Sequence, residues 1–229
     1  MILDFERICI DLNIEWQSKE AEFKDGPWAE FSAALKKKCI KSWGYPEAFL
    51  GWLLVLKFKP RAVLELGSQH GHSGLIWSDA TKRIGSLFIA LELGTDSRNK
   101  YTKECMGTMQ FLSDNDENIV KIWGDAEENL PEILNKYPID LIFHDCAHTW
   151  EHIEHCLTII QNFDPQIIQT CHDCATGKWQ PDRTTIYGVI CAERPVFDKY
   201  FLNNKDYYYA IMETKHGFGM AIHRGKLQK

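Results

Sequence analysis

The sequence predicts an α/β fold, with a mostly parallel sheet covered by helices on both faces and ended by an antiparallel hairpin. Two observations predict it. From residue 61 onward, short apolar runs alternate with helical segments, a pattern typical of parallel strands joined by right-handed crossovers. The last two apolar runs, 207–212 and 218–223, are too close for a helical crossover and should therefore pair antiparallel.

The expected elements follow in order along the chain. Residues 1–58 look helical, with the clearest candidates over 28–40 and 46–58. The expected strands are 62–66, 86–91, 119–123, 139–144, 166–171 and the two of the hairpin. The expected connecting helices are 72–80, 96–112, 127–136, 149–162 and 185–202. We therefore predict seven strands, a helical cap over residues 1–58 and one compact ligand-binding domain over residues 59–229.

Composition narrows the class of protein. The 229 residues are 45% hydrophobic and 25% charged, which suits one globular domain. A net charge of −6 without a long Lys/Arg block argues against binding to nucleic acid. Apolar runs stay short of 18 residues and the first residues do not resemble a signal peptide, so we expect no membrane contact and a cytoplasmic location.

The chain has eight cysteines, which a reducing compartment would leave as thiols. Cys171 and Cys174 form the one C-x-x-C pair. A four-cysteine zinc site would need a second pair, so zinc or redox chemistry here is a minor alternative and the role of the two thiols stays open.

A glycine-containing turn follows the first expected strand of the sheet. Gly67 and Gly71 lie four residues apart and Glu65 precedes the first of them by two. Glycines allow a ligand to approach the backbone, and the next helix offers free N–H groups to an anion. The spacing differs from the dinucleotide pattern G-x-G-x-x-G, which disfavours a dehydrogenase. An ordinary tight turn remains an alternative.

Acidic residues end the next two expected strands. The number of residues between Gly67 and Glu92 is close to that at which an acid binds the ribose hydroxyls in such folds. Asp125 ends the third strand at the same edge of the sheet, where it could reach an adenine. Together with the glycine turn, these acids fit one extended nucleoside ligand.

The segment from Glu65 to Ser73 resembles the first motif of class I S-adenosylmethionine-dependent methyltransferases, especially the catechol and macrocin O-methyltransferase groups, which are also labelled cephalosporin hydroxylase-like. The similarity extends to Gly124-Asp125-Ala126, to Asp145 with His148, and to His172-Asp173. It implies a Rossmann-like sheet and methyl transfer to a hydroxyl, or an amine, of a small molecule. The implied cofactor contacts are Glu65, Gly67, Ser68, Gly71, Ser73, Glu92, Asp125, Ala126 and Asp145.

Polar clusters follow the fourth and fifth strands of the expected parallel series. Because these strands should be neighbours, Asp145, His172 and Asp173 should lie together, and carboxylates with an imidazole can hold a divalent metal. The resemblance implies that these three residues bind magnesium or manganese. His172 stands where an acid is usual, so another metal or a metal-free polar pocket stays open.

His148 is the preferred general base, since a neutral imidazole accepts a proton near pH 7, and Asp145 is the second catalytic candidate. A capping or solvent-facing role for His148 is the alternative. Residues 175–185 are a candidate lid. The expected partners are a small-molecule acceptor, which the sequence does not identify, and a second copy of the chain. A non-methylating enzyme and a non-catalytic S-adenosylmethionine-binding protein are the competing functions.

Overall fold

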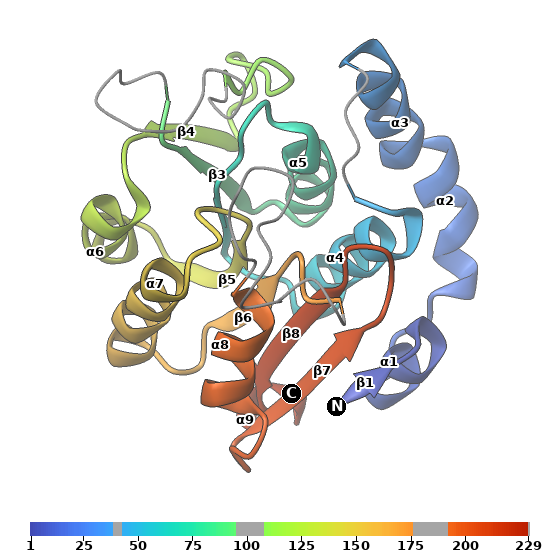
Figure 1. Ribbon diagram of the computed structural model, residues 1–229. Coiled ribbons are helices and arrows are strands. Elements are labelled where there is room, and N and C mark those ends of the chain that lie inside the picture. Colours follow the sequence, from blue (N-terminus) through green and yellow to red (C-terminus); the bar gives the residue numbers. More distant parts are fainter. Residues whose placement is uncertain (39–42, 95–107, 176–191, 229) are drawn as a thin grey trace.

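The computed structural model describes residues 1–38, 43–94, 108–175 and 192–228. It confirms the α/β class, with a central sheet between two layers of helices (Figure 1). The strand order is β1-β7-β8-β6-β5-β2-β3-β4. The strands are β1 (Ile2–Leu3), β2 (Ala62–Leu66), β3 (Leu87–Glu92), β4 (Ile119–Trp123), β5 (Ile139–His144), β6 (Ile168–Cys171), β7 (Tyr207–Met212) and β8 (Phe218–His223). Only the β6–β8 and β7–β8 pairs are antiparallel among the described strands, so the hairpin is confirmed.

The sheet has one strand more than the seven expected. Residues Ile2 and Leu3 pair in parallel with Ile211 and Met212 of β7, at the edge of the sheet. The apolar spacing had placed Leu3 in a helix instead. That helix starts at Phe5, after β1, because the Asp4 carboxylate accepts a hydrogen bond from the Arg7 amide at 2.7 Å and caps it. Two residues are too few for a period-2 pattern to reveal such a strand.

The helices divide between the two faces of the sheet (Figure 1). On one face lie α1 (Phe5–Asp11), α2 (Glu20–Asp25), α3 (Pro27–Lys38), α4 (Tyr45–Phe58) and α5 (His72–Ile84), with the 3₁₀ turn η1 (Gln17–Lys19). On the other lie α6 (Ala126–Lys136), α7 (Trp150–Phe163) and α8 (Glu193–Phe201). The short α9 (Arg224–Leu227) follows β8. Among the residues described, no helix is long and apolar enough to cross a membrane.

Helix α4 is apolar around most of its circumference because it lies inside the main core. Trp52 and Phe49 are almost fully buried there, and the indole N–H of Trp52 donates to Asp79 at 2.7 Å. Glu47 is also fully buried, at the third position of the helix. A buried charge requires partners, and those of Glu47 lie at the candidate site described below.

Two expected helices differ from the structure. The expected helix 96–112 falls largely on residues 95–107, outside the described part, but 108–112 form a turn and that end of the prediction is wrong. There the amide of Met109 donates to the carbonyl of Gln69 at 2.9 Å, and that of Phe111 to His70 at 3.1 Å, so contacts with the glycine turn replace helical ones. The expected helix 185–202 starts at Glu193 in the described residues. Residues 176–191, which include most of the candidate lid, lie outside them.

Candidate active site

The polar residues predicted from sequence line one edge of the sheet, at the carboxyl ends of its parallel strands. Residue Leu66 of β2 is in register with Leu91 of β3 and with His144 of β5. His144 is in turn in register with Cys171 of β6. The loops that follow β2, β3, β5 and β6 therefore begin side by side, where ligands bind in sheets of this topology.

The glycine turn after β2 packs directly on the loop after β5. Gly67 has a φ of +90°, and a Cβ atom at this position would lie 2.2 Å from the carbonyl oxygen of Asp145. The amide of Asp145 donates to the carbonyl of Leu66 at 3.0 Å. Gly71, with a φ of +84°, precedes α5, and a Cβ atom there would lie 2.7 Å from Leu112. Both glycines are therefore required by close approach as well as by backbone conformation.

The acid at the end of β3 fixes the same turn. Glu92 is almost fully buried, and its Oε2 accepts from the amide of Gln69 at 2.6 Å. Its carbonyl accepts from Gly124 at 2.9 Å, at the end of β4. Asp125 caps α6, accepting from the amide of Glu127 at 2.8 Å. Glu92 and Asp125 thus end adjacent strands beside the glycine turn, as their spacing predicts.

Beneath the turn, Glu65 is fully buried at the end of β2. The Ser68 hydroxyl donates to its Oε2 at 2.7 Å, while its Oε1 has no hydrogen-bond partner among the described residues. Burial raises the pKa of Glu65 to about 7, although the Ser73 and Ser68 hydroxyls act in the opposite direction. The hydroxyls of Ser68 and Ser73 therefore favour the ionised form of this carboxyl group.

The loop after β5 carries His148, whose Nδ1 hydrogen-bonds with the carboxylate of Glu193 at the start of α8. Burial alone would lower the pKa of His148, but the negative charge of Glu193 outweighs it, and Asp145 and Asp173 add to the effect, so the pKa rises to about 9. Burial also raises the pKa of Glu193, so the pair retains a proton at neutral pH. Residue Glu193, not found from the sequence, thus makes His148 an imidazolium rather than the neutral imidazole assumed above.

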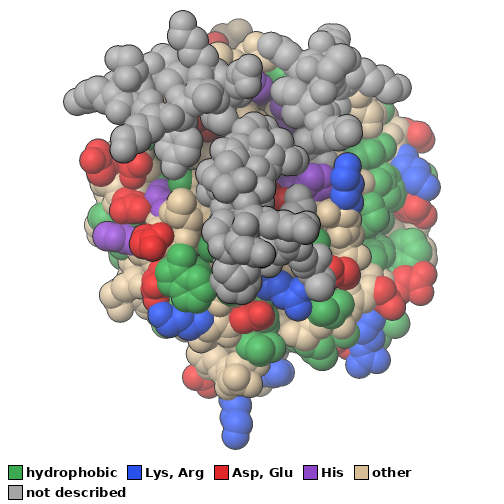
Figure 2. Space-filling model, in the orientation of Figure 1, with side chains coloured by type: hydrophobic (Ala, Val, Ile, Leu, Met, Phe, Trp, Pro, Cys, Tyr) green, Lys and Arg blue, Asp and Glu red, His purple; other side chains and the backbone are tan. Residues whose placement is uncertain are grey.

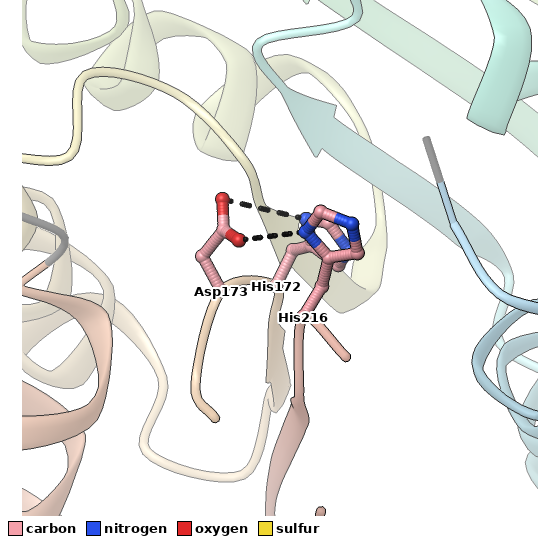
Figure 3. A group of neighbouring side chains, drawn as sticks. All are labelled: His172, Asp173 and His216. Atoms are coloured by element: carbon pink, nitrogen blue, oxygen red, sulfur yellow. Dashed lines mark hydrogen bonds and ion pairs between the residues drawn. The ribbon is translucent and has the colours of Figure 1, made fainter. Parts of the chain in front are cut away.

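After β6, the imidazole of His172 lies among carboxylates. Its Nδ1 is 3.5 Å from Asp145 Oδ1 and 3.7 Å from Asp173 Oδ2. Figure 3 shows that the Asp173 carboxylate also faces His216, from the turn between β7 and β8, with Oδ1 3.2 Å from its Nδ1. Burial by itself would lower the pKa of His172. The negative charges of Asp145 and Asp173 outweigh this effect and raise the pKa well above its ordinary value. Away from this cluster, Figure 2 shows histidine beside acidic side chains at the left of the molecule, over α6 and α7.

Glu47 approaches His172 from the N-terminal helices. One oxygen, Oε2, accepts from the amide of Gly44 at 2.6 Å and lies 3.8 Å from His172 Nε2. The other, Oε1, accepts from the Gly217 amide at 3.2 Å and from the Thr214 hydroxyl. Burial would raise the pKa of Glu47, but His172 and the Gly44 amide lower it below the ordinary value. Glu47 therefore joins α4 to the turn that carries His216.

The other residues of the two polar clusters have structural roles. His144 is buried, and its Nε2 lies 2.8 Å from Gln169 Oε1. Burial lowers its pKa to about 4, so it is neutral at physiological pH. The thiols of Cys171 and Cys174 are buried and their sulfur atoms are 2.9 Å apart, against Gly219.

A thiol–imidazole contact links the loop after β5 to α6 and α7. The Cys146 Sγ atom lies 3.1 Å from His152 Nε2, and His152 Nδ1 is 2.8 Å from Glu127 Oε1. Residue Glu127 lies in the first turn of α6, next to Ala126 and the capping Asp125. This contact therefore fixes the loop carrying Asp145 relative to Asp125 and Ala126.

Three side chains of the site were missed from the sequence: Glu47, Glu193 and His216. Each lies far along the chain from the predicted site residue that it approaches, and no local pattern reveals such a contact. One signal was available for Glu47, which is the one acidic residue in the mostly apolar helix α4. Such a residue must be paired where it is buried.

Comparisons with known proteins agree with this geometry. Residues 64–174 match the family model described as a methyltransferase domain. This segment is therefore similar to methyltransferase domains. The match contains Glu65, the glycine turn, Glu92, Asp125, Asp145 and the pair His172-Asp173, so it spans the candidate site except for the parts contributed by α4, α8 and the β7–β8 turn.

The chain also resembles solved structures over almost its whole length. The S-adenosylhomocysteine-bound methyltransferase PaMTH1 of Podospora anserina is 17% identical, with 97% of this chain and 98% of that chain covered and a TM-score of 0.61. A Bacillus cereus O-methyltransferase in complex with S-adenosylhomocysteine is 15% identical, with coverages of 91% and 98% and a TM-score of 0.62. The O-methyltransferase TomG of Streptomyces achromogenes, in complex with S-adenosylmethionine, is 18% identical, with coverages of 97% and 99% and a TM-score of 0.60.

At these identities the likenesses establish the class I methyltransferase fold of the chain. A comparison with curated proteins gave no match. The site residues are therefore argued from their chemistry in this chain.

Proposed function

We propose that the protein transfers the methyl group of S-adenosylmethionine to a hydroxyl oxygen of a small-molecule acceptor. The observation that carries this proposal is the packing of Gly67 against Asp145, which joins the glycine turn to the loop holding the histidine and carboxylate groups. A nucleoside cofactor on that turn has its reactive end next to those groups. The solved O-methyltransferases that hold S-adenosylmethionine or S-adenosylhomocysteine support the same cofactor here.

The cofactor end of the site consists of the turn and the acids at the ends of β3 and β4. The Glu92 carboxylate binds the ribose hydroxyls and Asp125 with Ala126 lies beside the adenine. The methionine part lies over Gly67 and Gly71, at the N-terminus of α5. The further contacts of this set are Glu65, Ser68, Ser73 and Asp145.

The acceptor end consists of Asp145, His148, His172 and Asp173. His172 Nδ1 lies 3.5 Å from an oxygen of Asp145 and 3.7 Å from an oxygen of Asp173, an arrangement that can hold a divalent metal, for which the resemblance implies magnesium or manganese. Such an ion would lower the pKa of an acceptor hydroxyl and help to position it for transfer.

In the transfer, the neutral form of His148 accepts the hydroxyl proton on Nε2 while Glu193 holds its Nδ1, so the imidazolium must first lose its proton. The acceptor oxygen forms its bond to the methyl carbon as the carbon–sulfur bond breaks, and the sulfonium becomes a neutral thioether. Asp145 and Asp173 both raise the pKa of His148, so neutralising their charge favours the imidazole form that can accept the proton. Base catalysis by His148 thus depends on the charge state of the neighbouring carboxylates.

Three further parts of the proposal concern the whole chain. We propose that residues 1–58 act as a helical cap on a cofactor-binding domain of residues 59–229. We propose a homodimer that uses the N-terminal helices, and a cytoplasmic location. Light scattering of the purified protein tests the dimer, which a monomeric mass would contradict.

A transfer assay tests the function. The protein is incubated with methyl-labelled S-adenosylmethionine and a panel of phenols, catechols, hydroxy acids and amines, with and without a chelator. We expect label in at least one hydroxylated acceptor and its loss in Asp145→Asn, but not in the exposed control Glu151→Gln. Labelled amines alone would contradict O-methylation. Cofactor binding without transfer to any acceptor would support the alternative of a non-catalytic binding protein.

A further inference from the structure

Two histidines and an aspartate converge beside β6. Their ligand atoms all lie within 4.8 Å of one another, and the set consists of His172, Asp173 and His216. The rings of His172 and His216 stack with centroids 5.1 Å apart and planes 19° apart, and each faces one oxygen of the same carboxylate (Figure 3). The residues come from two separate segments, the loop after β6 and the turn between β7 and β8.

We propose that His216 is a metal ligand, and that His172, His216, Asp173 and Asp145 together form a two-nitrogen, two-carboxylate centre selective for first-row transition ions over Mg²⁺. This inference rests on the proposed function, because it concerns the residues at the acceptor end of the same site. It adds His216 to the metal ligands and specifies which class of metal they bind. No sequence pattern indicated His216, since one histidine in a short turn carries no metal spacing.

The donor set supports the metal class. Mg²⁺ prefers six oxygen ligands and keeps several waters, whereas imidazole nitrogen suits Zn²⁺, Fe²⁺ and their neighbours. The distance from His216 Nδ1 to Asp173 Oδ1 is 3.2 Å, and that from His172 Nδ1 to Asp145 Oδ1 is 3.5 Å. Ligands about 2.1 Å from one ion are roughly 3.0 to 3.5 Å apart in octahedral or tetrahedral geometry. The ligand atoms of His172, Asp173 and His216 lie within 4.8 Å of one another, and Asp145 approaches this set through His172 Nδ1, so the four groups have to move closer together to share one ion.

Glu47 supplies the outer partner that a ligating histidine requires. Histidines that bind a metal through one ring nitrogen usually donate the other N–H to a carboxylate, which fixes the tautomer. His172 Nε2 is buried without a hydrogen-bond partner among the described residues, and Glu47 Oε2 is the carboxylate oxygen 3.8 Å away from it. A small rotation of the ring closes this hydrogen bond and leaves Nδ1 free for an ion.

The surrounding structure holds the ligands in place. Asp173 has a φ of +54°, an uncommon conformation for a residue other than glycine. The Thr214 hydroxyl and the Gly217 amide, on either side of His216, both donate to Glu47. One buried carboxylate thus positions both the ring of His172 and the turn that carries His216.

The test measures metal binding directly. Chelator-treated protein is titrated with Zn²⁺, Co²⁺ and Mg²⁺ in a calorimeter, and the Co²⁺ complex is followed by its visible absorption. We expect Zn²⁺ and Co²⁺ to bind at least tenfold more tightly than Mg²⁺, and His216→Gln to weaken Co²⁺ binding about 10- to 100-fold. The exposed His155→Gln, a matched histidine substitution, should leave binding unchanged.

Two results would overturn the inference: Mg²⁺ binding as tight as Zn²⁺ binding, or unchanged Co²⁺ affinity in His216→Gln. If that variant fails to fold, pulsed electron paramagnetic resonance of wild-type protein with bound Mn²⁺ decides instead, since it must detect two imidazole nitrogens. S-adenosylmethionine is titrated into the same metal-free samples. If the cofactor binds and the metal selectivity is absent, this inference fails alone, whereas absence of cofactor binding defeats the proposed function.

Discussion

The imidazole of His148 shares a hydrogen bond with Glu193, a buried carboxylate in the first turn of α8. This contact gives the proposed base a fixed orientation and a raised pKa of about 9. Removal of the carboxylate charge should therefore change the protonation of His148 more than its position.

The first prediction follows from this pair. In Glu193→Gln the pKa of His148 should fall from about 9 to near or below its ordinary 6.5, since burial then acts with less opposition. In the wild-type protein, we expect His148 to stay protonated at neutral pH and to lose its proton as the pH rises through about 9. An NMR titration of the ring protons measures it, with Glu151→Gln as the control. If the pKa of His148 is unchanged in Glu193→Gln, the charge of Glu193 does not raise it.

The second prediction compares two glycines. Gly67→Ala places a Cβ atom 2.2 Å from the Asp145 carbonyl oxygen, whereas Gly85, also at positive φ, has no atom within 4 Å of the same position. Gly85→Ala should cost about 1 kcal/mol of stability through backbone strain alone. Gly67→Ala should cost at least about 2 kcal/mol and weaken S-adenosylmethionine binding more than about tenfold. Thermal unfolding and calorimetry give both quantities, and similar losses in the two variants would contradict the close packing of the turn.

The third prediction concerns the stability of the cofactor-free protein against pH. The pKa of Glu65 is raised from the ordinary 4.5 to about 7 by folding, so this carboxyl group costs the folded protein stability progressively as pH rises from 4.5 to 7. Glu65→Gln should therefore gain stability relative to wild type as pH rises from 5 to 8, by up to about 3 kcal/mol. Denaturant unfolding at several pH values measures the difference. The exposed Glu128→Gln should show no such trend, and a pH-independent effect of Glu65→Gln would refute the assigned burial cost.

The fourth prediction separates ligand binding from loop structure. Glu92→Gln keeps an oxygen that can accept from the Gln69 amide but loses the charge that binds the ribose hydroxyls. We expect S-adenosylmethionine affinity to fall about tenfold or more, with little change in melting temperature. Glu132→Gln, on the exposed side of α6, is the control for the lost charge. Unaltered affinity in Glu92→Gln would remove this residue from the cofactor site.

Much of the fold follows from local sequence. The apolar runs that became β2 to β8 are bounded by turns, and their alternation with helices determines the parallel connections. β1 was missed because Ile2 and Leu3 become a strand only through pairing with β7. Residues 108–112 were wrongly given to a helix because carbonyls of Gln69 and His70, distant in sequence, accept the amides of Met109 and Phe111.

The candidate site also contains residues that could be predicted from local sequence and residues that could not. Asp145 and Asp173 could be predicted as site residues because each follows a parallel strand, and the carboxyl ends of parallel strands lie at one edge of the sheet. The partners Glu47, Glu193 and His216 come from elements outside that series, so their approach depends on tertiary packing. The protonation of His148 could not be read from the sequence for the same reason, because it is determined by Glu193 at the start of another helix.

Calorimetric titration of the chelator-treated protein with S-adenosylmethionine and, separately, with NAD tests the central claim most directly. We predict saturable binding of S-adenosylmethionine, weakened in Glu92→Gln, and no heat of binding with NAD. Binding of NAD instead, or the absence of S-adenosylmethionine binding both with and without added metal, would contradict it.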